Sequence, residues 1–249
     1  MSGLAVPRGA AVVIGAHGGL GRALSELLRA DARYPQVLGF SRHGEPGHAA
    51  SAVGPTNPLD ITSEASIASA AAQVASWLQT DAPLRLVIDA TGFLHGHGFE
   101  PEKTWRQLDA AHMAHSFAVN AIGPALLMKH FLPLLPRHGK AVFATLSAKV
   151  GSIGDNRLGG WYSYRAAKAA LNQLVHTAAI ELARAKPEAI CVALHPGTVN
   201  TGLSSPFAKT GLEVQTPAES AACLLAVIDA LEAPASGGFF NHHGETLPW

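Results

Sequence analysis

Short apolar runs alternate with longer amphipathic stretches along the whole chain. The runs are apolar at almost every position, which is typical of strands buried on both faces. They occupy residues 10–14, 36–41, 84–90, 140–146 and 189–194, with a last short strand expected at 237–240. The stretches between them repeat their apolar positions with the period of a helix. These stretches cover residues 22–29, 63–79, 104–117, 119–135, 164–185 and 216–231.

The alternation of strands and helices predicts an α/β fold, a Rossmann-type, doubly wound parallel sheet of about seven strands flanked by helices. Residues 43–58 are rich in glycine, proline, alanine and histidine, and we expect a loop or a short irregular helix there. Residues 202–215 are small and polar, as in a mobile lid. The chain has no internal repeat, low-complexity tract or linker, so we expect residues 1–249 to form a single domain.

A glycine-rich segment directly follows the first apolar run. It reads Gly15-Ala16-His17-Gly18-Gly19-Leu20-Gly21. A glycine turn between a strand and a helix leaves backbone N–H groups and the positive end of the helix pointing at one place, which suits a pyrophosphate. The Gly-x-x-x-Gly-x-Gly spacing differs from the commoner G-x-G-x-x-G fingerprint, so a plain turn with a capping glycine is the alternative.

The end of the second apolar run bears on which nucleotide would bind. A carboxylate at this place would bind the adenosine ribose hydroxyls of NAD, but the run ends in Ser41 and Arg42. Arg42 would suit the 2′-phosphate of NADP. The alternative is an ordinary exposed arginine.

Tyr164 and Lys168 lie four residues apart at the start of the helix expected over 164–185. At this spacing both side chains share one face of a helix, with the ammonium one turn beyond the phenol. A nearby positive charge favours the phenolate, so we expect Lys168 to lower the pKa of Tyr164 from its usual value of about 10. A phenol tuned in this way can act as general acid or base for a carbonyl and alcohol pair. Such pairs also occur by chance on surface helices.

Composition narrows the function classes. Hydrophobic residues make up 48% of the 249 residues and charged residues 14%, as in a chain that buries many elements or an oligomer interface. The net charge of zero gives no reason to expect nucleic acid or a membrane as a partner. The two cysteines lie in apolar runs, which suits a reducing compartment. No signal-peptide cleavage site and no stretch long enough to span a bilayer is apparent, so we expect a cytoplasmic protein.

Four motifs occur in the order and on the elements typical of one enzyme family. They are the glycine segment 15–21, Asn120 in a long helix, Ser147 at a strand end, and the Tyr164 and Lys168 pair. Together with the proline–glycine segment 195–201, they make the chain resemble the short-chain dehydrogenase/reductases over essentially its whole length. The loop 151–165 and the terminal Leu-Pro-Trp resemble more narrowly the C-factor-like and carbonyl-reductase-like branch.

The resemblance implies a catalytic set of four residues. Tyr164 would donate a proton to a carbonyl oxygen as hydride arrives from the nicotinamide, or remove it from an alcohol in reverse. Lys168 would hold the nicotinamide ribose, and Ser147 would hydrogen-bond the substrate oxygen. Asn120 would hold a helix irregularity and a water that links Lys168 to solvent. The implied activity is that of an NAD(P)(H)-dependent oxidoreductase, with NADPH-dependent reduction of an aldehyde or ketone favoured.

The resemblance also implies which residues bind the cofactor. Asp60 and Ile61 would flank the adenine, and Val199 and Thr201 would bond the carboxamide. The full set is Gly15, His17, Gly18, Gly19, Leu20, Gly21, Ser41, Arg42, Asp60, Ile61, Ala90, Thr91, Gly92, Tyr164, Lys168, Pro196, Gly197, Val199 and Thr201.

Three features depart from the family pattern. Ile14 stands where a threonine usually braces the glycine turn. Asp89-Ala-Thr-Gly92 replaces the usual Asn-Asn-Ala-Gly, so bonding at that strand end must differ. Of the family's two adjacent serines, the second is usually catalytic, and alanine occupies that place at 148. Either Ser147 takes the role, or Ser152 does, or the substrate oxygen is bound less well; we favour Ser147.

Three further expectations concern ligands and partners. The thirteen histidines form only local pairs, whereas zinc needs three or four convergent ligands, so we expect no metal. The helices 119–135 and 164–185 pack across a two-fold axis in relatives, which predicts a homodimer or homotetramer, with burial against the sheet as the alternative. Two other functions are open, a non-catalytic nucleotide-binding signalling or interaction protein of C-factor type and a dehydrogenase working with NAD.

Overall fold

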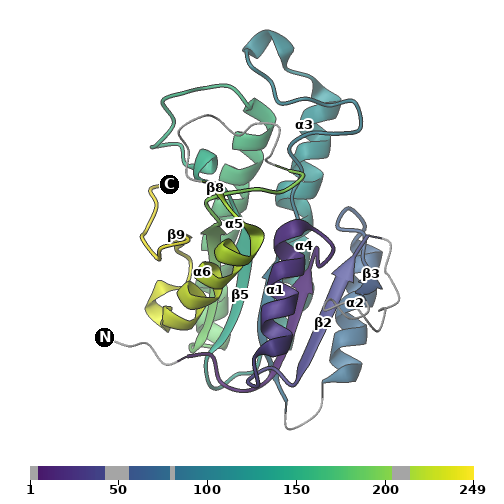
Figure 1. Cartoon of the computed structure of the whole chain (residues 1–249), viewed down its shortest axis with the longest axis vertical. Coiled ribbons are helices and arrows are strands. Elements are labelled where there is room, and N and C mark those ends of the chain that lie inside the picture. The colour runs from purple at the N-terminus through teal and green to yellow at the C-terminus, as the bar shows by residue number, and fades with distance from the viewer. Residues whose placement is uncertain (1–4, 43–55, 79–81, 204–213) are drawn as a thin grey trace.

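The computed structural model describes residues 5–42, 56–78, 82–203 and 214–249. At its centre is a seven-stranded parallel sheet with the strand order β3-β2-β1-β4-β5-β6-β9 (Figure 1). The strands are β1 Ala10–Ile14, β2 Gln36–Ser41, β3 Thr56–Pro58, β4 Leu84–Asp89, β5 Ala141–Leu146, β6 Ala189–His195 and β9 Phe239–Asn241. The order reverses next to β1, which confirms the predicted doubly wound fold.

Helices cover both faces of this sheet (Figure 1). One face carries α1 Gly19–Ala30 and α6 Pro217–Ala230, and the other carries α2 Glu64–Trp77, α4 Gly123–Phe131 and α5 Tyr162–Ala185. Because successive side chains of a strand point to opposite faces of the sheet, the strands contribute residues to two separate cores. Val12 belongs to the core under α5, for example, and Val13 to the core under α1.

The helix expected over 104–117 is two separate elements. A short 3-10 turn, η1 Trp105–Gln107, is followed by extended backbone at Leu108. The helix α3 Ala110–Phe117 follows, with Asp109 as its N-cap. The Asp109 side chain accepts a hydrogen bond from the backbone N–H of His112. This N-cap is a stronger start signal than the apolar period that suggested one continuous helix. Figure 1 shows α3 extending beyond the edge of the sheet.

The helix expected over 119–135 also differs from the prediction. It opens with a π-helical turn, η2 Ala118–Ile122, continues as α4, and closes with the 3-10 turn η3 Leu132–Leu134. Pro124 explains the wide turn, because its nitrogen cannot donate to the carbonyl of Asn120 four residues earlier. The chain therefore accommodates one extra residue at this position.

Three short strands, β3, β7 Thr198–Val199 and β8 Val214–Gln215, are the elements that the apolar pattern did not predict. β3 lies in the segment 43–58 that was expected to be irregular, and β7 pairs with β8 in a second small sheet. Strands of two or three residues are too short to show a period. The rest of the expected lid, 204–213, and residues 43–55 lie outside the described residues.

The expectation that no stretch could span a bilayer is wrong by length and composition alone. The continuous helical region Ala110–Leu134 is long and apolar enough, with a mean hydropathy of 1.3 over its most apolar window. One such helix is weak evidence for a membrane, because core helices pass the same test. Here Leu127 and Phe131 are fully buried in the core that also contains Leu171 of α5.

The close packing of α4 on the segment after β3 can be tested by a substitution at Gly123. A methyl group at this position would lie 2.6 Å from the carbonyl oxygen of Ile61, which must then move. We expect Gly123→Ala to lower the free energy of unfolding by about 1–3 kcal/mol in denaturant titrations. Gly202→Ala is the matched control, since nothing lies within 4 Å of its added methyl group. Equal stability of the two variants would contradict the close packing of α4.

Candidate active site

The residues expected to form the site follow the carboxyl ends of the parallel strands. The glycine segment follows β1, Arg42 follows β2, and residues 60–61, 90–92, 147 and 196–201 follow β3, β4, β5 and β6. Since all these strands run in one direction, their ends share one edge of the sheet. The first turns of α5 bring Tyr164 and Lys168 to this same edge.

The glycine loop before α1 has the shape of an anion cradle. Gly15 has a φ of +81°, which glycine adopts without strain. A side chain on Gly21 would overlap the carbonyl oxygen of Gly15. Gly18 is the N-cap of α1, so no side chain at this position caps the first N–H groups of the helix. The first turn of α1 has no acidic residue. The positive helix end is therefore open to an anion, and the cradle suits a pyrophosphate.

Loops that are distant in the sequence close around this cradle. A methyl group on Gly19 would lie 3.1 Å from Cγ2 of Thr201, and one on Gly15 would lie 3.0 Å from the carbonyl of Ala90. A methyl group on Gly92 would lie 3.7 Å from Oδ1 of Asn120. The segments after β1, β4 and β6 are therefore neighbours, as the resemblance implies for one cofactor. His17 is exposed on this loop, and Leu20 is buried beneath it.

The ends of β2 and β3 lie farther along the same edge of the sheet. The hydroxyls of Ser41 and Thr56 lie 3.0 Å apart. The carboxylate of Asp60 accepts the hydroxyl and the backbone N–H of Thr62, and these bonds lower its pKa, with the charge of Arg42 acting in the same direction. Arg42 itself is exposed. A guanidinium thus stands where the resemblance implies contact with a ribose or its phosphate.

The structure brings Tyr164 and Lys168 together in a buried environment. Tyr164 is 9% exposed and Lys168 is 2% exposed. Nζ of Lys168 lies 5.8 Å from the centre of the Tyr164 ring and donates a hydrogen bond of 2.7 Å to the carbonyl of Leu146. The Trp161 and Tyr164 rings meet edge to face with centroids 6.2 Å apart.

The expected direction of the Tyr164 pKa shift is wrong. Burial raises the pKa of Tyr164, because a site with little water favours the neutral phenol. Burial also lowers the pKa of Lys168 to about 8, and the charge of Asp89 opposes this shift. Lys168 directs its ammonium group to the carbonyl of Leu146, so desolvation outweighs its effect on the phenol. Sequence spacing carries no information about this balance.

Asn120 occupies the π-helical turn and is fully buried. Its Oδ1 accepts the backbone N–H of Phe93 at 2.9 Å, and its Nδ2 donates to the carbonyl of Phe93 at 2.8 Å and to Oγ of Ser116 at 3.2 Å. The helix irregularity is present where the resemblance placed it, and Asn120 ties it to the segment after β4. The water-mediated link to Lys168 stays a prediction.

Both candidate serines use their hydroxyl groups within the fold. Ser147 donates to Oδ1 of Asn172 at 2.7 Å, and Ser152 donates to the terminal carbonyl of Trp249 at 3.2 Å. Both serines are buried. Since a hydroxyl has one proton, each could offer a substrate only its oxygen in this arrangement.

Sequence reasoning missed Glu102, a buried residue that holds the start of α5. Its carboxylate accepts the backbone N–H of Ser163 at 3.2 Å and the Ser163 hydroxyl, and it lies 3.4 Å from Nδ1 of His112. A carboxylate at this place satisfies helix N–H groups that the N-cap Trp161 leaves without a side-chain partner. Glu102 lies 61 residues from Ser163 in a loop, where no periodic signal could reveal the contact.

The residues just before α5 are held in an unusual backbone conformation. Gly159, Gly160 and Trp161 have consecutive φ values of +64°, +69° and +52°. For the tryptophan this left-handed conformation costs roughly 1–2 kcal/mol. The backbone N–H of Trp161 donates to the carbonyl of Glu102, and the Arg165 side chain bonds the carbonyl of Gly160 at 3.0 Å. These contacts hold the Trp161 ring against Tyr164.

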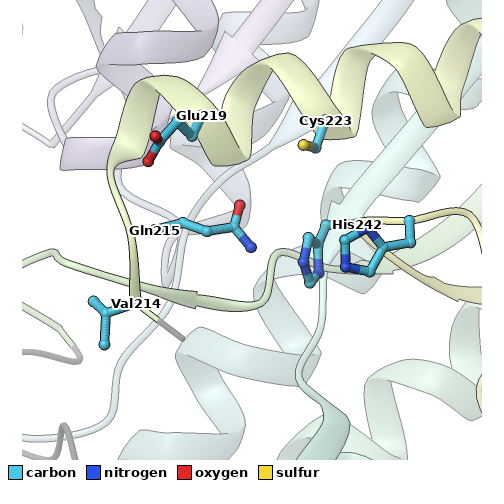
Figure 2. Close-up of a pocket in the computed structure, with 6 residues that line it drawn as sticks. Val214, Gln215, Glu219, Cys223 and His242 are labelled. Atoms are coloured by element: carbon cyan, nitrogen blue, oxygen red, sulfur yellow. The ribbon is translucent and has the colours of Figure 1, made fainter. Parts of the chain in front are cut away.

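A pocket of about 290 Å³ adjoins the proline–glycine segment after β6 (Figure 2). It is lined by Val214, Gln215, Glu219, Cys223, His242 and His243. A methyl group on Gly197 would lie 2.8 Å from Nε2 of Gln215 and 3.0 Å from the His242 ring. The carbonyl of Pro196 accepts the hydroxyl of Ser220 on α6 at 2.8 Å, and Val199 is buried. The segment is therefore firmly placed between α6 and this pocket.

The histidines near the site form an aromatic cluster. The rings of Phe93 and His115 have centroids 4.4 Å apart, and those of Phe99 and His112 have centroids 4.9 Å apart. His95 lies 3.1 Å from the carbonyl of Gly202. Within the described ranges, no group of three histidine, cysteine, aspartate or glutamate side chains could hold a metal ion.

The chain is similar to several known proteins. The short chain dehydrogenase family matches residues 9–211. C-signal of Myxococcus xanthus is 37% identical over 144 residues, which cover 57% of this chain and 81% of C-signal. The 1-hydroxy-2-glutathionyl-2-methyl-3-butene dehydrogenase of Rhodococcus sp. strain AD45 is 29% identical over 238 residues, which cover 96% of this chain and 98% of that enzyme. The NADPH-bound carbonyl reductase from chicken fatty liver matches the full length of both chains, with a TM-score of 0.83 and 28% identity.

The low pKa of Lys168 predicts a pH-dependent stability that Lys168→Met removes. Between pH about 8 and 10.5, the unfolded lysine keeps a proton that the folded lysine has lost, so stability rises with pH. The unfolding free energy of the wild type, minus that of Lys168→Met, should rise by up to about 3 kcal/mol from below to above this window. Denaturant titrations below and above this pH window measure the difference. Lys103→Met, at an exposed lysine, is the control. A pH-independent difference would contradict the buried ammonium.

Proposed function

The chain belongs to the short-chain dehydrogenase family, and on that basis we propose that it reduces an aldehyde or ketone with NADPH. As a member it is an NAD(P)-dependent oxidoreductase that acts on small molecules. The observation that carries the finer proposal is the buried phenol of Tyr164, one helical turn from Lys168 and at the edge where the glycine loop lies.

Tyr164 is the general acid in this proposal. Because burial raises its pKa, the hydroxyl keeps its proton at neutral pH. A neutral phenol is the form that can donate a proton to a carbonyl oxygen. The nicotinamide, when bound, supplies the hydride.

Lys168 holds the cofactor ribose in this proposal. One of its three N–H groups is used by the carbonyl of Leu146, which leaves two for the hydroxyls of a ribose. This bond also fixes the direction of a side chain that would otherwise be flexible. The glycine loop, Ala90 and Thr201 would hold the remainder of the dinucleotide, since they are close neighbours at one edge of the sheet.

The serine role is the weakest part of the catalytic set. The protons of Ser147 and Ser152 are used in bonds to Asn172 and to Trp249. This supports the third of the open alternatives, in which the substrate oxygen is bound less well than in relatives with two serines. Ser147 could take the role only if its hydroxyl left Asn172.

One observation favours a second candidate function. C-signal, the relative with 37% identity, has a name that indicates signalling, and the Ser147 and Ser152 hydroxyls bond to Asn172 and Trp249 within the fold. A non-catalytic protein that binds the nucleotide would keep the glycine loop and need no proton donor. In that case Tyr164 would have no effect on any activity.

Ile122 and Ile180 are 53% and 49% exposed, on the η2 turn and on α5, and these two elements are in contact. We propose that they form a homodimer or homotetramer interface, since burying both side chains between copies would remove apolar surface from water. A cytoplasmic location is proposed with it.

Replacing the phenol tests the reductase proposal directly. Tyr164→Phe should lower kcat for carbonyl reduction by about 10²–10⁴-fold, because it removes the proton donor. NADPH affinity should not change. Tyr162→Phe is the matched control, since it removes a half-buried phenol from the same helical turn and should leave kcat unchanged. Unaltered turnover by Tyr164→Phe would rule out its role as general acid.

Arg42 tests the cofactor preference. Arg42→Ala should weaken NADPH binding by about 10–100-fold, the effect of losing a hydrogen-bonded charge, and should leave NADH binding unchanged. Fluorescence titration of both nucleotides measures the ratio. Arg137→Ala removes an equally exposed arginine before the amino end of β5 and is the control. If the NADPH/NADH ratio stays the same in Arg42→Ala, the proposed phosphate contact is absent and NAD becomes the candidate cofactor.

A further inference from the structure

Asp89 is a buried carboxyl group that the proposed reaction does not use. It is the last residue of β4 and is 1% exposed. Its Oδ1 accepts the hydroxyl of Thr91 at 2.6 Å and the backbone N–H of Thr91 at 3.0 Å, and its Oδ2 accepts the hydroxyl of Thr145 at 2.7 Å. Both oxygens are thus supplied with donors, which is the arrangement that a carboxylate needs inside a protein.

The carboxyl group faces the same side of the sheet as Lys168. Val87 and Phe143 belong to the core under α5, and side chains two residues apart on a strand share a face. Asp89 and Thr145, which pair across β4 and β5, therefore point toward α5 as well. The next residue on β5 is Leu146, whose carbonyl accepts the hydrogen bond from Lys168.

Few other groups can balance the lysine. Asn120 from η2 and Asn172 from α5 are neutral, and the neighbouring Tyr164 keeps its proton. Among the described residues, Asp89 is the charged group whose field acts on Lys168. Burial raises the pKa of Asp89, and the three donors together with Lys168 oppose that shift. An isolated buried ammonium group would lose its proton, whereas one facing a carboxylate keeps it.

We propose that Asp89 is the counter-charge of Lys168 and keeps the lysine protonated through the neutral pH range. The proposal rests on the proposed function, because a charged Lys168 is the form that holds a ribose beside Tyr164. Asp89 acts through the lysine and touches no reacting atom, so it is a positioning residue.

The proposal gives a reason for an unusual strand end. The family pattern Asn-Asn-Ala-Gly places an amide at this position, and this chain has Asp89 with Thr91 two residues later. An aspartate without these hydroxyls would be costly there, since the backbone N–H of Thr91 would be the one donor left to its two oxygens among the bonds described above. Thr91 and Thr145 provide two hydroxyls, so the three residues form one built anionic site.

The test measures the charge of Lys168 without requiring turnover. Protein labelled with ¹³C-lysine is titrated by NMR, and the Lys168 signal is assigned from its loss in Lys168→Met. In the wild type its midpoint should lie near pH 8. Asp89→Asn keeps the size of the side chain and removes the charge, so the midpoint should fall by about one pH unit or more. Ser116→Ala removes a buried hydroxyl without changing charge, and the midpoint should stay in place.

A second variant covers the case in which Asp89→Asn does not fold. Thr145→Val keeps the carboxyl group but removes one donor from it, which favours its neutral form, so the Lys168 midpoint should move down by a smaller amount. An unchanged or higher midpoint in the folded variant would overturn the proposal.

Turnover provides a separate readout. If the chain reduces carbonyl compounds, the alkaline decline of kcat should begin at lower pH in Asp89→Asn, whereas a merely structural role would lower kcat equally at all pH values and would count against the proposal. A falling NMR midpoint in a protein without reductase activity would support the Asp89–Lys168 pair and reject the proposed function, so the two failures are distinguishable.

Discussion

A positive charge buried beneath the carboxyl edge of the sheet is the constraint on which the rest of the site depends. Lys168 is almost completely removed from water, and an ammonium group in such a place is costly unless its surroundings compensate. The carbonyl of Leu146 and the carboxylate of Asp89 provide that compensation from β5 and β4. The same exclusion of water keeps Tyr164 neutral. Burial therefore favours the neutral form of both groups, and the charged form of Lys168 depends on the carbonyl and the carboxylate that compensate it.

The fold brings these groups to one place through elements that are far apart in the sequence. Parallel strands deliver the glycine loop, Ala90 and Thr201 to a common edge, where they pack against one another. The helix that carries Tyr164 is held at its start by Glu102, from a loop 61 residues away, and by the left-handed turn at Trp161. The likeness to an NADPH-bound carbonyl reductase extends over the whole chain, so the overall framework is shared with that protein.

Much of the fold could be predicted because buried strands have continuous apolar runs and the motifs occur in order along them. The parts that could not be predicted depend on contacts without a local signal. Pro124 widens a helical turn, and the serine hydroxyls are used by Asn172 and Trp249, which are distant in the sequence. The pKa of Tyr164 was predicted in the wrong direction because spacing identifies a neighbouring charge and says nothing about burial. Glu102 was missed because a lone acidic residue in a loop gives no pattern in the sequence.

Carbonyl reduction by this chain requires that a nicotinamide meet a carbonyl compound beside Tyr164. The most direct test of this requirement uses two preparations of NADPH, each with deuterium on a different face of the nicotinamide ring. The protein is incubated with each preparation separately, together with a panel of aldehydes and ketones. Mass spectrometry then measures deuterium in the alcohols. A single binding mode predicts that label is transferred from one face and not from the other. Alcohols that carry no label from either NADPH preparation would contradict carbonyl reduction by this chain. So would the absence of an alcohol from every member of the panel.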